Sequence, residues 1–394
     1  MIILVIGAGI HQIPGILKLK EKGHYVVAVD GDSSAEGKDI ADEFYQVDIK
    51  NSKEVISLIE GRNLKLDSAM CFSTEIALRT VADINEHFGL VGLNQKEVLV
   101  ATDKAAQRRV LKESGLPTPG FIELHAGYDD NVLSTLRLPL VVKPTDNAGS
   151  RGVALVREKE ELKSVITESL KESKYDAKVV VEEFVPGLEF TVEALIIAGS
   201  VHVLGISEKK KPINNYTVSV ELFYNSPFVN LHREEIESVV KPFLLNCGFD
   251  NTITHTEIIY SYLDHKFYVV ETTVRSGGFH IFDKILPGIT GLDIIGLTIE
   301  TLLGKKPTLG KVEKKAGILG FFYNNFGVIK NISIVDNALP QGVEYGLFVK
   351  EDDIIKDLST DGSRLGYYVT FGDTWNEAYD NAREVEYAVK FEIV

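Results

Sequence analysis

The stretch that decides the fold reads Leu138-Pro139-Leu140-Val141-Val142-Lys143-Pro144-Thr145-Asp146-Asn147-Ala148-Gly149-Ser150-Arg151-Gly152-Val153. An apolar run that ends in a lysine predicts a buried strand, and the small and glycine residues after it predict a turn into a second strand. Gly149 and Gly152 lack a Cβ, so backbone amides can approach an anion there. Lys143, Ser150 and Arg151 add donors or positive charge. The pattern favours a hairpin that closes over phosphates.

An ordinary polar hairpin loop is the alternative for this stretch taken alone. The spacing differs from that of a Walker motif, in which the lysine follows the last glycine and a helix begins. Here Lys143 precedes the glycines and lies on a strand. The rest of the chain therefore has to decide between the two interpretations.

Composition narrows the class of protein. The chain has 394 residues, of which 44% are hydrophobic and 25% charged, as expected for a globular protein of two or three domains. The net charge of -15 argues against nucleic acid as a partner, and no apolar run is long enough to span a membrane. With only Cys71 and Cys247, a disulfide framework is excluded, and we expect a cytoplasmic location.

The first 94 residues alternate expected strands and helices, which predicts a doubly wound parallel α/β domain. The strands are expected at 2–6, 25–30, 44–48 and 66–72, and the helices at 11–22, 52–60 and 75–87. Gly7-Ala8-Gly9 begins like a dinucleotide fingerprint, but Gln12 stands where a third glycine or alanine is needed, so a dehydrogenase is a weak alternative. Ser73, Thr74 and Glu75 follow a strand end, where such sheets bind ligands, although Ser73 or Thr74 could simply cap a helix.

A second group of polar residues lies on two apolar runs near residues 254–260 and 267–274, which predict neighbouring antiparallel strands. Glu257 and Glu271 lie near the ends of these runs, where carboxylates cost free energy unless they are paired or bind a metal. Oxygen ligands without a histidine or cysteine cluster favour magnesium over zinc. Thr273 and Arg275 follow Glu271 at alternating positions and should face the same side. A structural Glu271–Arg275 ion pair is the alternative.

Other segments complete the expected order of elements. Helices are expected at 95–101 and 103–114, with Lys104 in the first turn of the second helix. A strand at 179–185 ends before Pro186, which leaves backbone groups free for a ligand such as a purine edge. A hairpin is expected at 188–206, with a lysine-rich run after it. After Gly304 we expect strands at 316–323, 328–335, 343–349 and 365–371 and a helix at 374–390.

This ordered set of motifs resembles the ATP-grasp superfamily over essentially the whole chain. The resemblance is carried by Asp103-Lys104, by Lys143 with its glycine loop, by the segment Val181–Glu189, and by the paired glutamates ending in Glu271-Thr272-Thr273-Val274-Arg275-Ser276-Gly277-Gly278. The most similar group is the carboxylate-amine ligases of the amino-acid ligase and purine-biosynthesis type, with an architecture like that of biotin carboxylase.

The resemblance implies an α/β ATP-grasp fold with three domains. These are an N-terminal Rossmann-like domain (1–94), an ATP-grasp domain (95–305) with a glycine-loop subdomain at about 120–183, and a small β-rich C-terminal domain (306–394). The ATP-binding core would consist of two sheets.

The resemblance also implies roles for individual residues. The expected ATP contacts are Lys104, Lys143, Gly149, Ser150, Arg151, Gly152, Glu182, Glu183, Val185 and Glu189. Of these, the lysines and the loop would contact phosphates, residues 182–185 would hold adenine, and Glu189 would bind the ribose. The expected metal ligands are Glu257, Glu271 and Thr273, and the expected catalytic residues are Arg275 and Lys209. The expected substrate residues are Ser73, Thr74, Glu75, Glu221, Gly277 and Gly278.

The implied activity is ATP-dependent amide formation between a carboxylate and an amine through an acyl phosphate, with ATP and Mg²⁺ (or Mn²⁺). The resemblance also implies a homodimer. Two departures stand out. Thr273 replaces an asparagine ligand of the metal, and the segment at Glu221 lacks the glycine and histidine often found there. A bicarbonate-activating, carboxylase-like enzyme and a non-catalytic nucleotide-binding protein are the alternatives.

Overall fold

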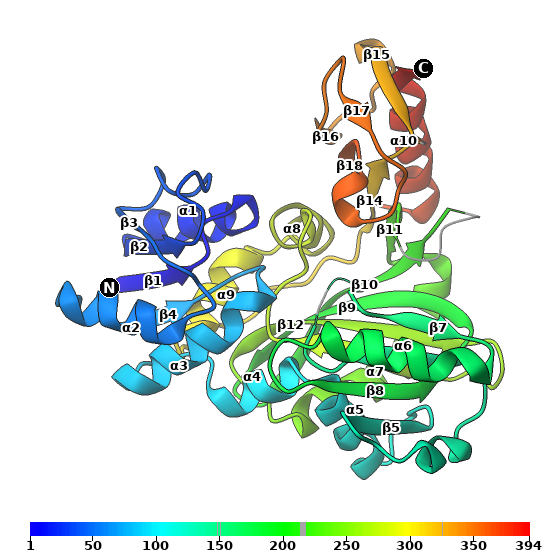
Figure 1. The fold of residues 1–394 in the computed structure, drawn as a ribbon. Coiled ribbons are helices and arrows are strands. Elements are labelled where there is room, and N and C mark those ends of the chain that lie inside the picture. The colour runs from blue at the N-terminus through cyan, green and yellow to red at the C-terminus, as the bar shows by residue number, and fades with distance from the viewer. Residues whose placement is uncertain (148, 150, 213–217, 325) are drawn as a thin grey trace.

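The computed structural model describes residues 1–147, 149, 151–212, 218–324 and 326–394. Its N-terminal part is a parallel sheet with the strand order β3-β2-β1-β4 (Figure 1). The strands are β1 (Ile2–Ile6), β2 (Tyr25–Asp30), β3 (Glu43–Gln46) and β4 (Ser68–Met70), and the helices are α1 (Ile13–Glu21), α2 (Ser52–Gly61) and α3 (Leu78–Phe88). The expected α/β class is thus confirmed.

Gln12, which breaks the dinucleotide fingerprint, has a structural function in this sheet. Its buried side chain accepts a hydrogen bond from the Phe72 N–H (2.9 Å) and donates one to the Thr74 hydroxyl (2.7 Å). It therefore ties the turn after β1 to the loop after β4. A glycine here could make neither bond.

The hairpin expected around Lys143 lies in a second, antiparallel sheet. Its strand order is β5-β8-β6-β7. The strands are β5 (Phe121–His125), β6 (Leu140–Pro144), β7 (Ala154–Val156) and β8 (Lys178–Glu183), and the nearby helices are α4 (Gln95–Ala101), α5 (Lys104–Glu113) and α6 (Leu162–Lys171). This small sheet has its own apolar core, to which α6 contributes Leu162 and Ile166.

The third sheet has eight antiparallel strands in the order β13-β12-β9-β10-β11-β14-β18-β16. The strands are β9 (Gly187–Ile197), β10 (Ser200–Lys210), β11 (Glu221–Tyr224), β12 (Thr252–Ser261), β13 (Phe267–Thr273), β14 (Ala316–Phe322), β16 (Glu344–Leu347) and β18 (Gly366–Gly372). Three strands from the last third of the chain thus extend the sheet that holds Glu257 and Glu271. The domain boundaries expected at 94 and 305 stay a prediction.

The remaining C-terminal elements form a small sheet of β17 (Ile354–Ile355), β15 (Gly327–Ile334) and β19 (Val389–Ile393), beside helix α10 (Trp375–Ala388). The helix expected up to Lys390 ends two residues earlier, because Val389 starts a strand that pairs with β15. Between β11 and β14 lie α7 (Pro227–Asn246), α8 (Leu286–Thr290) and α9 (Ile294–Leu302).

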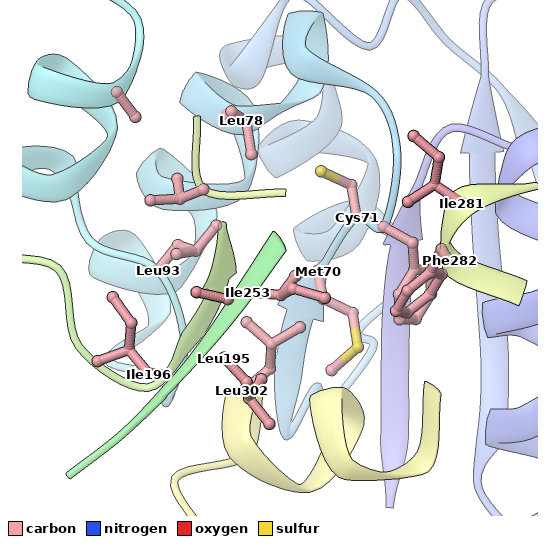
Figure 2. Packing of buried hydrophobic residues seen from close by; sticks show 14 of the residues in the cluster. Met70, Cys71, Leu78, Leu93, Leu195, Ile196, Ile253, Ile281, Phe282 and Leu302 are labelled. Atoms are coloured by element: carbon pink, nitrogen blue, oxygen red, sulfur yellow. The ribbon is translucent and has the colours of Figure 1, made fainter. Parts of the chain in front are cut away.

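One apolar core joins the N-terminal sheet to the large sheet. Figure 2 shows Met70 of β4 among Leu195 of β9, Ile253 of β12 and Leu302 of α9, and all four side chains are at most 4% exposed. In the described part of the chain, no single helix has the length and hydropathy to cross a membrane. Two consecutive helical segments, Ile281–Thr290 and Ile294–Leu302, have the required length and hydropathy only when they are taken together. They are bent by 113° relative to each other.

Candidate functional site

Two cations and one carboxylate meet on the small sheet. Lys143 of β6 and Glu182 of β8 are diagonal neighbours on adjacent strands, and their charged groups are in direct contact. Arg108, from helix α5, donates from Nε to Glu182 Oε2 (2.7 Å) and from a terminal nitrogen to the Val270 carbonyl (2.7 Å). All three side chains are at most 8% exposed. We call Arg108, Lys143 and Glu182 the small-sheet cluster.

The cluster carries a surplus positive charge. Burial would raise the pKa of Glu182, but Arg108 and Lys143 outweigh it and lower this pKa to about 2. Burial, reinforced by Arg108, lowers the pKa of Lys143 although Glu182 acts against it. One carboxylate thus compensates two buried cations, which favours the approach of an anion such as phosphate.

The glycines of the loop after Lys143 have distinct geometric roles. Gly149 has φ +67° and open space where a Cβ would lie. Gly152 has φ +73°, and a Cβ there would lie 2.7 Å from atoms of Pro144 and Glu172. Arg151 is exposed. Ser150, the other polar residue expected in the loop, lies outside the described residues.

Residues 182–189 were expected to hold the nucleoside. The Glu182 carboxylate contacts Arg108 and Lys143, as above, and the Glu183 carboxylate accepts two hydrogen bonds of 3.0 Å from the Arg137 guanidinium. Val185 follows β8, and Glu189 on β9 pairs with Lys211 at 2.5 Å. Their roles at adenine and ribose stay predictions.

Lys104 connects the small sheet to the large one. Its backbone N–H donates to the Thr145 carbonyl (2.9 Å) and its Nζ to the Asn147 carbonyl (2.6 Å), while Nζ also lies 2.9 Å from Glu271 Oε2. Burial would lower the pKa of Lys104, but Glu271 and then Glu75 outweigh it and raise this pKa. A cation in the first turn of a helix works against the helix dipole. Here it is stabilised by Glu271 on another element.

The expected pair of glutamates is brought together on the large sheet. Glu257 of β12 and Glu271 of β13 are direct cross-strand partners, and Glu257 pairs with Lys209 of β10 at 2.7 Å. Lys209 and Lys104 keep the pKa of Glu257 and of Glu271 respectively below the usual range, against the effect of burial. The Thr273 hydroxyl, also on β13, is buried without a hydrogen-bond partner. We call Lys209, Glu257, Glu271 and Thr273 the large-sheet cluster.

This donor set fits a magnesium ion that is shared with a ligand. Two carboxylates and an unpartnered hydroxyl are oxygen donors of the kind Mg²⁺ prefers. Among the residues that the structure describes, no group of three or more His, Cys, Asp and Glu side chains could hold a metal by itself. A metal here would therefore need further oxygen ligands from phosphate or water.

Sequence reasoning missed a buried histidine beside the glutamates. His255 Nδ1 lies 2.5 Å from Glu193 Oε1, and its Nε2 lies 3.9 Å from Glu257 Oε1. Burial would lower the pKa of His255, but Glu193 raises it to about 9. The signal was present in the alternation, because Glu193 and His255 share the strand face of Glu189 and Glu257. An imidazolium among carboxylates helps to compensate their charge.

The expected substrate residues of the N-terminal part meet the exit of β13. The Ser73 hydroxyl lies 2.9 Å from that of Ser276, and the Ser276 N–H donates to the Phe72 carbonyl (3.0 Å). Arg275 pairs through a terminal nitrogen with Glu75 Oε2 at 3.4 Å. The alternative ion pair of Arg275 with Glu271 is therefore replaced by two others, because Glu271 pairs with Lys104.

The other expected substrate residues lie in two places. A Cβ on Gly277 would come within 3.1 Å of His255 Nδ1, so Gly277 adjoins the histidine that lies beside Glu257, and Gly278 follows it. Glu221 opens β11, where it contacts Arg383 of helix α10 and accepts a hydrogen bond from the Tyr368 hydroxyl (3.1 Å). The structure thus brings Glu221 to the C-terminal helix.

Comparison with known proteins gives the family context of this geometry. Residues 136–283 match the ATP-grasp domain, and residues 320–394 match the L-amino acid ligase C-terminal domain 2. The chain is 37% identical over 215 residues to a D-alanine–D-alanine ligase A of Bacillus cereus, a match that covers 53% of this chain and 65% of that ligase.

Solved structures with the same fold cover the whole chain. An L-amino acid ligase of Bacillus licheniformis superposes with a TM-score of 0.84 at 20% identity, over 100% of this chain and 98% of that one. The biotin carboxylase domain of a Hydrogenobacter thermophilus 2-oxoglutarate carboxylase was solved with MgADP, ADP and bicarbonate. It superposes with a TM-score of 0.77 at 19% identity, over 100% of this chain and 91% of that one. These likenesses confirm the fold expected from the sequence.

Proposed function

The chain belongs to the ATP-grasp superfamily, and from this premise we propose that it is an ATP-dependent ligase that joins a carboxylate to an amine. The observation that carries the proposal is the pairing of lysines with carboxylates across two sheets. Lys143 contacts Glu182, Lys104 contacts Glu271 and Lys209 contacts Glu257. A magnesium triphosphate offers phosphate oxygens to the three lysines and a metal to Glu257 and Glu271, while Glu182 keeps Arg108 as its partner.

We assign the phosphates to the lysines and the metal to the carboxylates. Lys143 and Lys104 would contact the phosphate chain, under the loop of Gly149 and Gly152. Glu257 and Glu271, assisted by the Thr273 hydroxyl, would hold Mg²⁺, which supplies charge neutralisation between the phosphates when bound. Support comes from the unpartnered Thr273 hydroxyl and from the surplus positive charge of the small-sheet cluster.

The reaction we propose has two steps. An oxygen of the substrate carboxylate attacks the terminal phosphorus of ATP, the bond to the bridging oxygen breaks, and ADP leaves. The amine then attacks the acyl carbon, inorganic phosphate leaves with the transferred oxygen, and the nitrogen loses a proton. Catalysis of this kind depends on positioning and charge stabilisation, for which lysines and an arginine are suited. Lys209 would lie at the terminal phosphate and Arg275 at the acyl oxygen.

The acyl phosphate can be tested with ¹⁸O-labelled carboxylates from a panel of amino acids and simple acids. We expect ADP release that requires both a carboxylate and an amine, with one labelled oxygen found in inorganic phosphate by mass spectrometry. Release supported by bicarbonate alone would favour a carboxylase-like reaction. Background hydrolysis across the whole panel would contradict the proposal.

A further inference from the structure

A histidine and an aspartate pair after β13, where the proposed reaction does not yet use them. His280 Nδ1 lies 3.0 Å from Asp283 Oδ2, and both side chains are 19% exposed. The His280 ring also packs against the ring of Tyr367 on β18, with the centroids 4.0 Å apart. The second ring nitrogen, Nε2, has no hydrogen-bond partner among the residues that the structure describes. One nitrogen and one face of the imidazole are thus held, and Nε2 can accept a proton.

The backbone holds this pair in an unusual conformation. Phe279 and His280 have φ of +50° and +66°, a left-handed conformation that non-glycine residues rarely adopt. A π-helical turn, Ile281–Ile285, follows and is closed by a hydrogen bond from the Ile285 N–H to the His280 carbonyl (3.0 Å). Phe282, 3% exposed, anchors this turn in the apolar core (Figure 2). Backbone strain and π-helical turns are concentrated at functional sites, which favours an active role for the pair.

The pair lines a small cavity beside the group assigned to the acyl oxygen. The cavity volume is about 20 Å³, which is enough for one small polar group such as a water molecule or an amine nitrogen. Arg275 donates from a terminal nitrogen to the Ser276 carbonyl (2.8 Å), directly before Gly277 in the cavity wall. The wall includes His11, Ser73, Gly277, Gly278, His280 and Asp283. A nucleophile in this cavity would therefore lie close to an acyl group held by Arg275.

The proposed second step needs a base at such a position, because an amine that attacks an acyl carbon has to lose a proton. An imidazole that is oriented by a carboxylate is well suited to take a proton near neutral pH. We propose that His280, held by Asp283, is the general base that deprotonates the attacking amine. The inference rests on the proposed function and adds a catalytic residue to it.

The proton and the electron pairs balance within the site. The lone pair of the amine nitrogen forms the bond to the acyl carbon, and the bond from this carbon to the phosphate oxygen breaks with its electrons on the phosphate. His280 Nε2 takes one proton from the nitrogen, while the Asp283 carboxylate compensates the charge of the imidazolium. The proton then passes to the leaving phosphate, which departs as hydrogen phosphate. His280 is neutral again, and no further reactant is needed.

His11 is the other histidine of the cavity and the rival base. Its ring packs against Phe279 with the centroids 5.0 Å apart, and among the described residues no carboxylate pairs with it. Burial, and then the neighbouring His280, lower the pKa of His11, which makes it a weaker base. Asp283 and Arg275 also act on this pKa, so both lie within electrostatic reach of the same ring. His280 has the orienting carboxylate that His11 lacks.

The choice of nucleophile separates a base from a purely structural pair. Hydroxylamine is an uncharged, strong nucleophile near neutral pH, so it traps an acyl phosphate as a hydroxamate with little need of a base. The test uses the carboxylate and the amine that give the most product in the panel above. In His280→Asn, we expect amide formation to fall by about 10²- to 10³-fold and hydroxamate formation to change by less than about twofold. Asparagine is chosen because it tolerates the left-handed backbone.

Three further variants sharpen the assignment. His265→Asn is the matched control, because His265 is an exposed histidine with φ +56° in the turn between β12 and β13, and we expect no effect on either product. Asp283→Asn should lower amide formation by about tenfold or more, since an amide cannot compensate the imidazolium. In His280→Gly, added imidazole should raise amide formation by about tenfold or more. Melting temperatures equal to that of the wild type would show that the variants are folded.

Each result decides between the interpretations. An equal loss of amide and hydroxamate in His280→Asn would overturn the inference in favour of a structural pair, and unchanged amide formation would overturn it outright. A larger loss in His11→Asn than in His280→Asn would assign the base to His11. A folded His280→Gly that imidazole does not rescue would also contradict it. All these outcomes leave the ligase proposal intact, whereas a wild type in which no carboxylate stimulates ADP release would overturn the proposed function itself.

Discussion

The small-sheet cluster and the large-sheet cluster use the same kinds of charged side chain in different proportions. On the small sheet, one carboxylate serves two buried cations, Arg108 and Lys143. On the large sheet, Glu257 and Glu271 each have one lysine. The first arrangement favours the binding of an anion. In the second, each glutamate is neutralised by one lysine, so a cation can bind only when the lysines find other partners.

This difference explains how the two clusters could bind one ligand together. A triphosphate alone would leave Glu257 and Glu271 facing negative charge, and a metal alone would face Lys104 and Lys209. Magnesium triphosphate satisfies both, because phosphates take the lysines while the metal takes the carboxylates. We therefore expect nucleotide and metal to bind with positive coupling.

The largest effect is expected when the small-sheet cluster loses its single carboxylate. Glu182→Gln leaves Arg108 and Lys143 buried without a counter-charge, and breaking such a pair costs about 3–5 kcal/mol in the free energy of unfolding. Chemical denaturation would measure it. The control is Glu183→Gln, because its partner Arg137 is 86% exposed and such pairs contribute at most about 1 kcal/mol. An equal loss of unfolding free energy in both variants would show that the Glu182 carboxylate stabilises the fold no more than an exposed ion pair does.

A substitution in the large-sheet cluster is expected to lower the rate of turnover and to leave the stability of the fold unchanged. Glu271→Gln removes a proposed metal ligand, and we expect magnesium-dependent turnover to fall by roughly 10²- to 10³-fold while the fold is retained. Mn²⁺ binding measured by electron paramagnetic resonance provides a readout apart from activity. Glu300→Gln, which removes a peripheral carboxylate paired with Lys22 at 2.9 Å, is the control. Full activity of Glu271→Gln would remove this residue from the metal site.

A smaller effect is expected for the nucleotide-binding cation. Lys143→Ala should weaken ATP binding by about 1.5–3 kcal/mol, as for a lost charge-assisted hydrogen bond, measured by calorimetry with a non-hydrolysable analogue. Lys171→Ala, which removes a 63% exposed lysine from α6, should leave the affinity unchanged. An unchanged affinity in Lys143→Ala would count against the phosphate assignment.

The smallest effect concerns acid pH. The pKa of Glu182 is lowered to about 2 from its usual 4.5, so its stabilising contribution is complete above pH 4.5 and is lost as the pH falls through 2. Between pH 4.5 and 3 the loss should be on the order of 1 kcal/mol. The wild type should thus lose stability more steeply than Glu182→Gln in this range. Parallel pH profiles of the two proteins would contradict the assigned pKa.

Much of the fold could be predicted from sequence, because local patterns determined it. The apolar runs around Glu257 and Glu271 predicted both strands and their antiparallel pairing. The cap residue Asp103 predicted where α5 begins. The extension of the large sheet by β14, β18 and β16 could not be predicted. Which strands join one sheet depends on pairing between residues far apart in the chain, such as Glu221 and Gly320.

The site was predictable where one strand carries several of its residues, and less so where partners come from different elements. The alternation of residues along one strand was enough to predict that Thr273 faces the same side as Glu271. It could not reveal that Arg108 crosses from α5 to Glu182, or that Glu75 and not Glu271 pairs with Arg275, because these contacts join segments 74 and 200 residues apart. Such pairs leave no periodic signal in the sequence.

The most direct test of this account is a crystal structure with Mg²⁺ and a non-hydrolysable ATP analogue. We expect the phosphates on Lys143 and Lys104 and the metal on Glu257 and Glu271, with the Lys104–Glu271 and Lys209–Glu257 ion pairs opened. A nucleotide bound elsewhere, or one bound while those two ion pairs stay intact, would contradict it.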